Sequence, residues 1–192
     1  MNKYKIIALC GKSAAGKDTV LRGFIQNCPE VHEIINCTSR PPREGEVNGK
    51  NYFFYTLNEM HDSYLAGRLL TATQFREWVY GTSEDGLSID KVNVGVFNPE
   101  SVRHLLENEK VEVYTVLVVA SDKMRLLRSL NREENPDVDE IVRRYLADKE
   151  DFENVGFSWN YIIENHGQGV CPKKMASVVT KILEEAEDHW AE

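Results

Sequence analysis

One stretch of sequence limits the fold more than any other, because a strand pattern, a glycine-rich turn and a helix pattern follow one another within residues 4–27. Residues 4–10 (YKIIALC) form a continuous apolar run, which is typical of a strand buried on both faces of a parallel sheet. The turn that follows reads GKSAAGK and matches G-x4-G-K. Residues 16 to about 27 then place apolar side chains at helical spacing. This order of elements is the context in which such a turn holds phosphate oxygens.

The chemistry of this turn predicts a nucleotide site. Its two glycines allow backbone N–H groups to point inward at phosphate oxygens, and Lys17 can bridge the terminal phosphates. The position after the lysine usually carries a hydroxyl that binds Mg²⁺, but here it is Asp18. A carboxylate beside phosphates repels them unless a cation lies between, so we expect Asp18 to take part in a Mg²⁺ site, directly or through water. Thr19 offers a hydroxyl on a different side of the helix, and loss of function at this position is the alternative.

The rest of the chain alternates between strand and helix patterns. Strand-like runs are predicted at residues 33–37, 92–97, 111–120 and 161–164. Helical patterns are predicted at residues 99–107, 122–130 and 173 to about 188. Such alternation over 192 residues predicts a single α/β domain with three layers and a mainly parallel sheet.

Two segments interrupt the alternation, and both are typical of insertions that stand on a core. Residues 38–86 contain a polar loop, two short aromatic strands at 52–55 and 69–75, and a helix between them. Residues 128–148 contain two basic helical pieces around the turn NREENPD. The predicted core therefore comprises residues 1–37, 87–127 and 149–192.

Composition narrows the function classes. A net charge of −8 argues against a general nucleic-acid-binding protein, and no apolar run reaches the roughly 18 residues that a membrane span needs. The N-terminal apolar run is too short for a signal peptide. Cys10, Cys28, Cys37 and Cys171 are scattered without CxxC spacing, which favours buried free thiols in a reducing cytoplasm over a zinc or disulfide site. The five histidines show no metal-ligand spacing.

A second phosphate site is indicated by the loop TSRPPREGEVNGKNY. It holds Arg40 and Arg43 three residues apart, stiffened by two prolines, and delivers Tyr52 after a glycine-containing turn. Two guanidinium groups and a phenol suit the phosphate of a monoester acceptor.

At this point the sequence resembles the guanylate kinase family over nearly its whole length. The acceptor loop TSRPPREGEVNGKNYFF is similar to that of the family, and the family hallmark Tyr-Gly-Ser/Thr is present as Tyr80-Gly81-Thr82. The lid pattern of the family is matched by Arg128, Arg132 and the run from Ile141 to Arg144, and its adenine-proximal asparagine is matched by Asn165.

The resemblance implies three groups of site residues. ATP would be held by Gly11, Lys12, Ser13, Ala14, Ala15, Gly16, Lys17, Asp18, Thr19 and Asn165, with Asp18 at the metal. The acceptor would be held by Asn36, Arg40, Arg43, Tyr52, Thr71, Tyr80, Thr82 and Asn98. Charge on the transferring phosphoryl group would be neutralised by Lys17, Arg128, Arg132 and Arg144.

The base-reading positions depart from the family. Counting from Tyr52 and from Tyr80 places Thr71 where the family has a glutamate that reads guanine. Asn98 and Asn36 stand where the family has an acid and a serine. Glu77 would lie about 20 Å further along an extended strand and cannot substitute. The phosphate-holding residues are therefore kept, and the residues that would read the base are changed.

The resulting prediction is a cytoplasmic, ATP- and Mg²⁺-dependent nucleoside monophosphate kinase, monomeric or homodimeric, that phosphorylates GMP or dGMP. Its partners would be small-molecule nucleotides, with no nucleic acid or membrane. The alternatives are another nucleoside monophosphate or a ribosyl phosphate as acceptor, and a non-catalytic binding module. The intact Lys17 disfavours the last of these.

Overall fold

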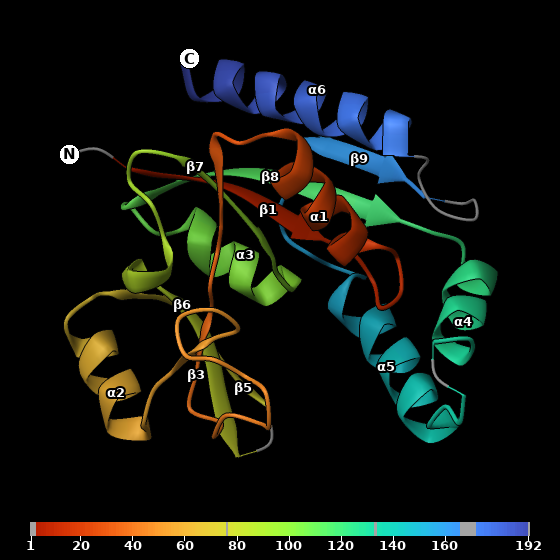
Figure 1. The fold of residues 1–192 in the computed structure, drawn as a ribbon, viewed down its shortest axis with the longest axis horizontal. Helices are drawn as coiled ribbons and strands as arrows, with labels where there is room; N and C mark the ends of the chain where they lie inside the picture. The colour runs from red at the N-terminus through yellow and green to blue at the C-terminus, as the bar shows by residue number, and fades with distance from the viewer. Residues whose placement is uncertain (1–2, 76, 133, 166–171, 192) are drawn as a thin grey trace.

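The computed structural model describes residues 3–75, 77–132, 134–165 and 172–191. Its core is a parallel five-stranded sheet (Figure 1) with the order β2–β7–β1–β8–β9. The strands are β1 (Tyr4–Cys10), β2 (Val31–Glu33), β7 (Val92–Val96), β8 (Val111–Val119) and β9 (Tyr161–Glu164). The central strand β1 therefore delivers the glycine-rich turn to the carboxyl edge of the sheet, where ligands of such folds bind.

Helices cover both faces of this sheet, which makes the core three layers thick (Figure 1). Helices α1 (Lys17–Asn27) and α6 (Pro172–Ala191) pack on one face, and α3 (Pro99–Leu106) packs on the other. Side chains of β1 alternate between the two cores, since Ile7 belongs to the first and Ile6 to the second. The predicted three-layer α/β fold with a parallel sheet is confirmed.

Close packing of α1 on α6 depends on Gly23. A Cβ atom at this position would lie 2.4 Å from the Cγ atom of Met175 on α6. Phe24 and Val20 of α1, each fully buried, fill the space beside this contact. Helix α1 is thereby fixed against the core immediately behind the glycine-rich turn.

A second sheet lies beside the core, at the lower left of Figure 1. Its order is β4–β3–β6–β5, and α2 (Leu57–Leu65) accompanies it. The strands are β3 (Cys37–Thr38), β4 (Phe53–Phe54), β5 (Leu69–Phe75) and β6 (Trp78–Ser83), followed by the short helix η1 (Glu84–Gly86). Its strands carry Thr71, Tyr80 and Thr82, and the loop between β3 and β4 carries Arg40, Arg43 and Tyr52.

Helices α4 (Asp122–Leu130) and α5 (Val138–Asp151) stand apart from the second sheet, at the lower right of Figure 1. Side-chain caps fix where they begin, because Ser121 accepts from the Met124 N–H group and Asp137 accepts from the Glu140 N–H group. Helix α1 begins differently, with Gly16 at its N-cap and no side-chain cap.

The structure corrects one predicted element and adds another. The predicted strand at residues 33–37 is wrong, because the chain leaves the core sheet after Glu33 and enters the second sheet at Cys37. Its apolar run is divided between two sheets, with the Ile34 N–H group still bonded to the Val94 carbonyl and the Asn36 carbonyl already bonded to Phe53. Strand β6 was not predicted. It is held on both sides by β3 and β5.

Three of the four cysteines, Cys10, Cys28 and Cys37, are buried free thiols, and Cys171 lies outside the described residues. Burial raises the pKa of the Cys10 thiol to about 12. Within the described part of the chain, no helix is both long enough and apolar enough to cross a membrane.

Candidate functional site

The glycine-rich turn at residues 11–17, hereafter the phosphate loop, joins β1 to α1. It contains positive φ angles, which residues with a side chain rarely adopt. Gly16 has φ of 106°, and a Cβ atom there would lie 2.3 Å from Nδ2 of Asn165. Ala14 also has a positive φ of 58°. Gly16 is the N-cap of α1, and no side chain caps this end of the helix. The positive end of the helix dipole therefore lies beside the loop without a side-chain acceptor. This is the geometry of an anion-binding helix N-terminus.

Lys17 lies across the loop. Its Nζ atom donates to the Gly11 carbonyl at 2.7 Å and to the Lys12 carbonyl at 3.3 Å. Burial lowers the pKa of the Lys17 ammonium, and the adjacent Asp18 carboxylate partly offsets this. A half-buried cation at the N-terminal end of a helix suits the terminal phosphates of a nucleotide.

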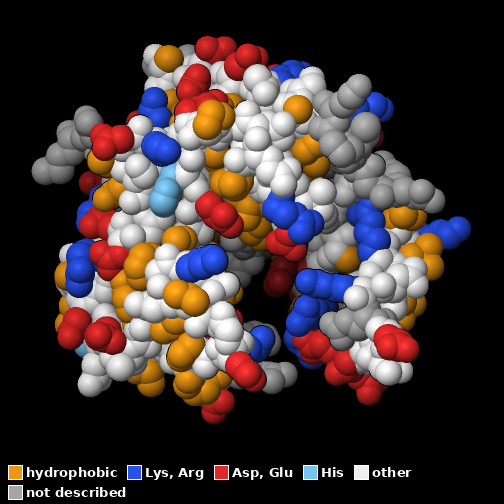
Figure 2. All heavy atoms as spheres, in the orientation of Figure 1, with side chains coloured by type: hydrophobic (Ala, Val, Ile, Leu, Met, Phe, Trp, Pro, Cys, Tyr) orange, Lys and Arg blue, Asp and Glu red, His pale blue; other side chains and the backbone are white. Residues whose placement is uncertain are grey.

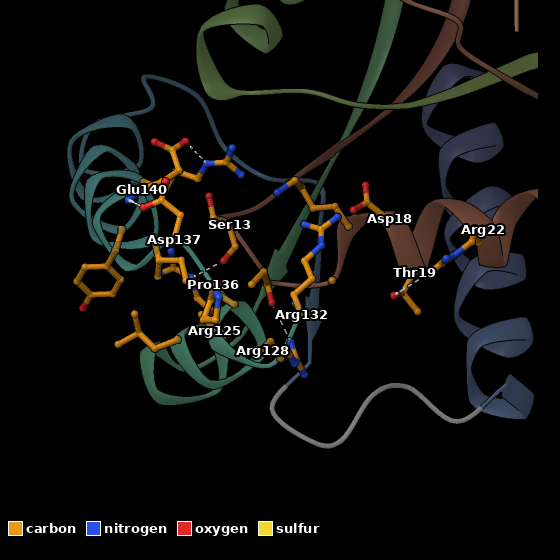
Figure 3. A pocket seen from close by; sticks show the side chains of 18 residues that line it. Ser13, Asp18, Thr19, Arg22, Arg125, Arg128, Arg132, Pro136, Asp137 and Glu140 are labelled. Carbon is orange, nitrogen blue, oxygen red and sulfur yellow. Dashed lines mark hydrogen bonds and ion pairs between the residues drawn. The ribbon is translucent and has the colours of Figure 1, made fainter. Parts of the chain in front are cut away.

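A cavity of about 520 Å³ opens in front of the loop, between α1, α4 and α5 (Figure 3). Six basic residues line it, namely Lys17, Arg22, Arg125, Arg128, Arg132 and Arg144. Three acidic residues line it, namely Asp18, Asp137 and Glu140. In a protein of net charge −8, this excess of positive charge in one cavity favours an anionic ligand.

The arginines of this cavity are held in different ways. Arg128 on α4 donates through one nitrogen to the carbonyls of Ala14 and Ala15, both at 3.2 Å, and through the other to the carbonyl of Asn165 at 3.0 Å. The Asn165 amide in turn donates to the Ala15 carbonyl at 2.8 Å. Arg128 and Asn165 therefore both brace the phosphate loop, which their predicted roles at the phosphoryl group and at adenine did not include.

Arg144 and Arg132 are exposed and reach the cavity from α5 and from the turn after α4. The Nε atom of Arg144 donates to Glu140 at 2.7 Å, and Arg143 donates to the same carboxylate at 2.7 and 2.8 Å. These two guanidinium groups lower the pKa of Glu140 to about 2. The cavity thus presents Arg144 on a lid helix, oriented by an ionised carboxylate.

Asp18 lines the cavity from the first turn of α1 (Figure 3). Thr19, the next residue, accepts a 3.5 Å hydrogen bond from Arg22. Among the described residues, no cluster of three or more His, Cys, Asp or Glu side chains could hold a metal ion by itself. One carboxylate does fit Mg²⁺ when substrate phosphates supply further oxygens, which is the usual arrangement for this ion.

The second site lies in the other half of the molecule, where Arg40 is buried with 8% exposure. Its guanidinium pairs with both oxygens of Glu46, at 2.9 and 3.0 Å, and lies 5.7 Å from the ring centres of Tyr52 and Phe54. Glu46, and then hydrogen bonding with Tyr80, raises the pKa of Arg40. The rings of Tyr52 and Tyr80 meet edge to face at 6.2 Å.

These contacts bring together Arg40, Tyr52 and Tyr80, three of the residues that the sequence suggests for the acceptor. Arg43 is exposed, and its backbone N–H group donates to Glu46 at 2.6 Å. Sequence reasoning missed Glu46. It lies three residues after Arg43, and this short spacing was the only available signal.

The residues at the base-reading positions form a neutral network rather than a charged one. The buried Thr71 accepts from the Thr82 N–H group at 3.1 Å, and the Thr82 hydroxyl donates to the Asn36 carboxamide oxygen at 2.7 Å. Asn98 has a different role, because its side-chain oxygen caps α3 by accepting from the Ser101 N–H group at 2.7 Å. Asn36, Thr71 and Thr82 are therefore joined by hydrogen bonds, whereas Asn98 is the N-cap of α3.

An open cleft separates the second sheet from helices α4 and α5 (Figure 1 and Figure 2). Lys and Arg side chains gather along the α4–α5 side of this cleft, and the second sheet forms the opposite wall. Basic side chains are therefore present on both sides of the cleft, in the phosphate-loop cavity on one side and at Arg40 on the other.

Comparison with known proteins agrees with this geometry. The family model described as guanylate kinase matches residues 3–182. The chain is 30% identical to the guanylate kinase of Geobacter sulfurreducens over an alignment of 182 residues that covers 89% of this chain and 85% of that protein. It is 36% identical to the guanylate kinase of a Nostoc species over 83 residues, which are 43% of this chain and 42% of that protein.

A solved structure gives the same fold. The crystal structure of guanylate kinase from Anaplasma phagocytophilum superposes with a TM-score of 0.60 at 16% sequence identity, covering 98% of this chain and 87% of that one. At this level of identity, the likeness supports the fold.

Proposed function

The chain belongs to the guanylate kinase family, and from this we propose that it is a phosphotransferase that moves the γ-phosphoryl group of ATP to a nucleoside monophosphate, with GMP or dGMP as the acceptor. The observation that carries the proposal is the pairing of two anion sites across one cleft. One is the phosphate loop with Lys17, and the other is the cluster of Arg40, Tyr52 and Tyr80.

In this proposal the phosphate loop and Lys17 hold the phosphates of ATP. Arg132 and Arg144 approach the transferring group from the lid at residues 128–148, while Arg128 keeps the loop in shape. Phosphoryl transfer depends mainly on positioning and on positive charge around the equatorial oxygens, so these cations supply what the reaction requires. Bound Mg²⁺ would neutralise further phosphate charge, with Asp18 as its protein ligand.

The acceptor phosphate is assigned to the loop that carries Arg40 and Arg43. Glu46 fixes the orientation of the Arg40 guanidinium before any ligand binds, which lowers the ordering cost of recognition. Tyr52 and Tyr80 present two phenols beside it. Residues 38–86 would close over the acceptor, and residues 128–148 would close over ATP.

The base is assigned to the wall formed by Asn36, Thr71 and Thr82. Neutral oxygens and an amide can bond to guanine, so GMP fits. They do not impose the penalty on other bases that an unpaired buried carboxylate would. The relatives described above are all named guanylate kinase, and neither a ribosyl phosphate acceptor nor a non-catalytic module gains support from them.

The test is an ADP-release assay with purified protein, ATP and Mg²⁺, run across GMP, dGMP, AMP, CMP, UMP and ribose phosphates. We expect turnover with GMP or dGMP and none with ribose phosphates. Failure of every nucleoside monophosphate, under conditions where the protein binds ATP, would contradict the proposed reaction.

A further inference from the structure

The base of the lid is tied to the phosphate loop through Asp148, in the last turns of α5. This residue is 8% exposed. Its carboxylate accepts from the Ser13 backbone N–H group at 2.8 Å and from the Ser13 hydroxyl at 3.3 Å. It also pairs with Arg125 of α4. Two segments 135 positions apart in sequence therefore meet at one loop residue.

Arg125 completes the grip on Ser13. Its Nε atom donates to the Ser13 carbonyl at 2.9 Å, and its two terminal nitrogens donate to Asp122 at 2.9 Å and to Asp148. Its guanidinium carbon lies 5.4 Å from the ring centre of Tyr145, whose hydroxyl donates to Asp122 at 2.7 Å. Both backbone polar groups of Ser13 are thus held from outside the loop.

These contacts separate Arg125 from the other arginines of the cavity. It is 2% exposed, and each of its three nitrogens already has a protein partner. Its charge compensates a carboxylate that would otherwise stand, unpaired, beside a site for phosphates. A buried carboxylate without its partner is strongly unfavourable, and near phosphates it would also repel the ligand.

We propose that Asp148 is a positioning residue for the phosphate loop, which holds Ser13 and thereby sets the N–H groups that follow it relative to α5. The same helix carries Arg144 one turn earlier, so Asp148 also fixes where that arginine starts its approach. This inference rests on the proposed function for its catalytic consequence. The effect on nucleotide binding stands without it.

The first test compares Asp148→Asn with Glu150→Gln, a change at an exposed carboxylate of the same helix. We expect Asp148→Asn to weaken binding of a fluorescent ATP analogue about tenfold and to lower kcat about 10- to 100-fold, because small displacements of positioning groups have effects of this size. The KM for the acceptor should stay unchanged. Glu150→Gln should behave as wild type. A folded Asp148→Asn protein with wild-type ATP affinity and kcat would overturn the proposal.

The second test uses the ion pair between Arg125 and Asp148. Arg125→Gln should weaken ATP binding more than Asp148→Asn does, since it leaves the carboxylate uncompensated. Adding Asp148→Asn to Arg125→Gln should then restore part of the affinity. If the double variant binds ATP no better than Arg125→Gln alone, the carboxylate is not the group that needs compensation, and the proposal fails.

A third measurement decides the matter if the variants do not fold. In wild-type protein without nucleotide, the Ser13 amide should exchange its hydrogen slowly, because Asp148 accepts it. Rapid exchange at Ser13 would contradict the anchor. If wild-type protein binds the ATP analogue but phosphorylates no acceptor, the proposed function fails while the ATP affinities still test Asp148.

Discussion

Replacing Thr71 with glutamate should change both the stability and the selectivity of this protein. Thr71 is 4% exposed, and its hydroxyl oxygen accepts from the Thr82 N–H group at 3.1 Å. Removing that acceptor costs about 1–3 kcal/mol, and a longer, charged side chain adds costs of overpacking and desolvation. A decrease of about 3 kcal/mol in the free energy of unfolding would lower the melting temperature by roughly 6–12 °C for a chain of this size.

The same change should favour guanine. A carboxylate at this wall can accept from the N1 and N2 donors of guanine, and adenine or a pyrimidine would leave it unpaired. Such a difference is worth about 1–3 kcal/mol, which corresponds to a selectivity gain of roughly ten- to two-hundredfold. GMP should therefore raise the melting temperature of Thr71→Glu more than AMP does, and by a wider margin than in wild type.

The assay measures kcat/KM for GMP, AMP, CMP and UMP in wild type, in Thr71→Glu and in the control Gln74→Glu. Gln74 is an exposed residue of the same strand. The control Gln74→Glu therefore adds the same negative charge to β5 without changing Thr71. Two results would refute the reasoning. One is a wild-type preference for GMP above about a thousandfold. The other is a folded Thr71→Glu protein whose selectivity equals that of wild type.

Three further predictions concern the phosphate site. Lys17→Ala should lower kcat by several orders of magnitude with an unchanged circular dichroism spectrum, since it removes the half-buried cation of the loop; near-normal turnover would contradict its assignment. Asp18→Ala should raise the Mg²⁺ concentration required for half-maximal activity and Asp18→Ser should retain activity, whereas an unchanged Mg²⁺ titration in Asp18→Ala would make Asp18 a bystander. A bisubstrate analogue should slow hydrogen exchange in residues 38–86 and 128–148 together, because closure excludes water from the transferring group; unaltered exchange in both segments would rule out that closure.

The strands of the core could be predicted from the sequence because a buried strand requires a local run of apolar residues. Strands β1 and β8 are mainly apolar runs, which is typical of strands covered on both faces. Strand β6 has no such run, because its residues WVYGTS mix aromatic, small and polar side chains and depend on partners in β3 and β5. The division of residues 33–37 between two sheets depends on which strand lies next to each half, and periodicity does not contain that information.

The candidate site divides in the same way. Lys17 and the residues of the acceptor loop lie within short motifs, so their spacing indicated a function. Arg125 and Asp148 are 23 residues apart and come into contact only through the packing of α4 and α5 around Ser13. Their shared contact with Ser13 could not be predicted from the sequence, because it depends on how the two helices pack.

The second sheet lies within the connection between two strands of the core sheet, β2 and β7. Strands β2 and β7 are parallel neighbours in the core, with Val31 opposite Val92, and everything between them belongs to one crossover. Parallel neighbours always require a long connection, and here that connection holds the residues assigned to the acceptor. The phosphate loop follows β1, outside this crossover. A change within this connecting segment would therefore act on the proposed acceptor site and leave the phosphate loop in place. Thr71, which stands where the family resemblance implies a charged reader, lies inside this segment, and Lys17 lies outside it.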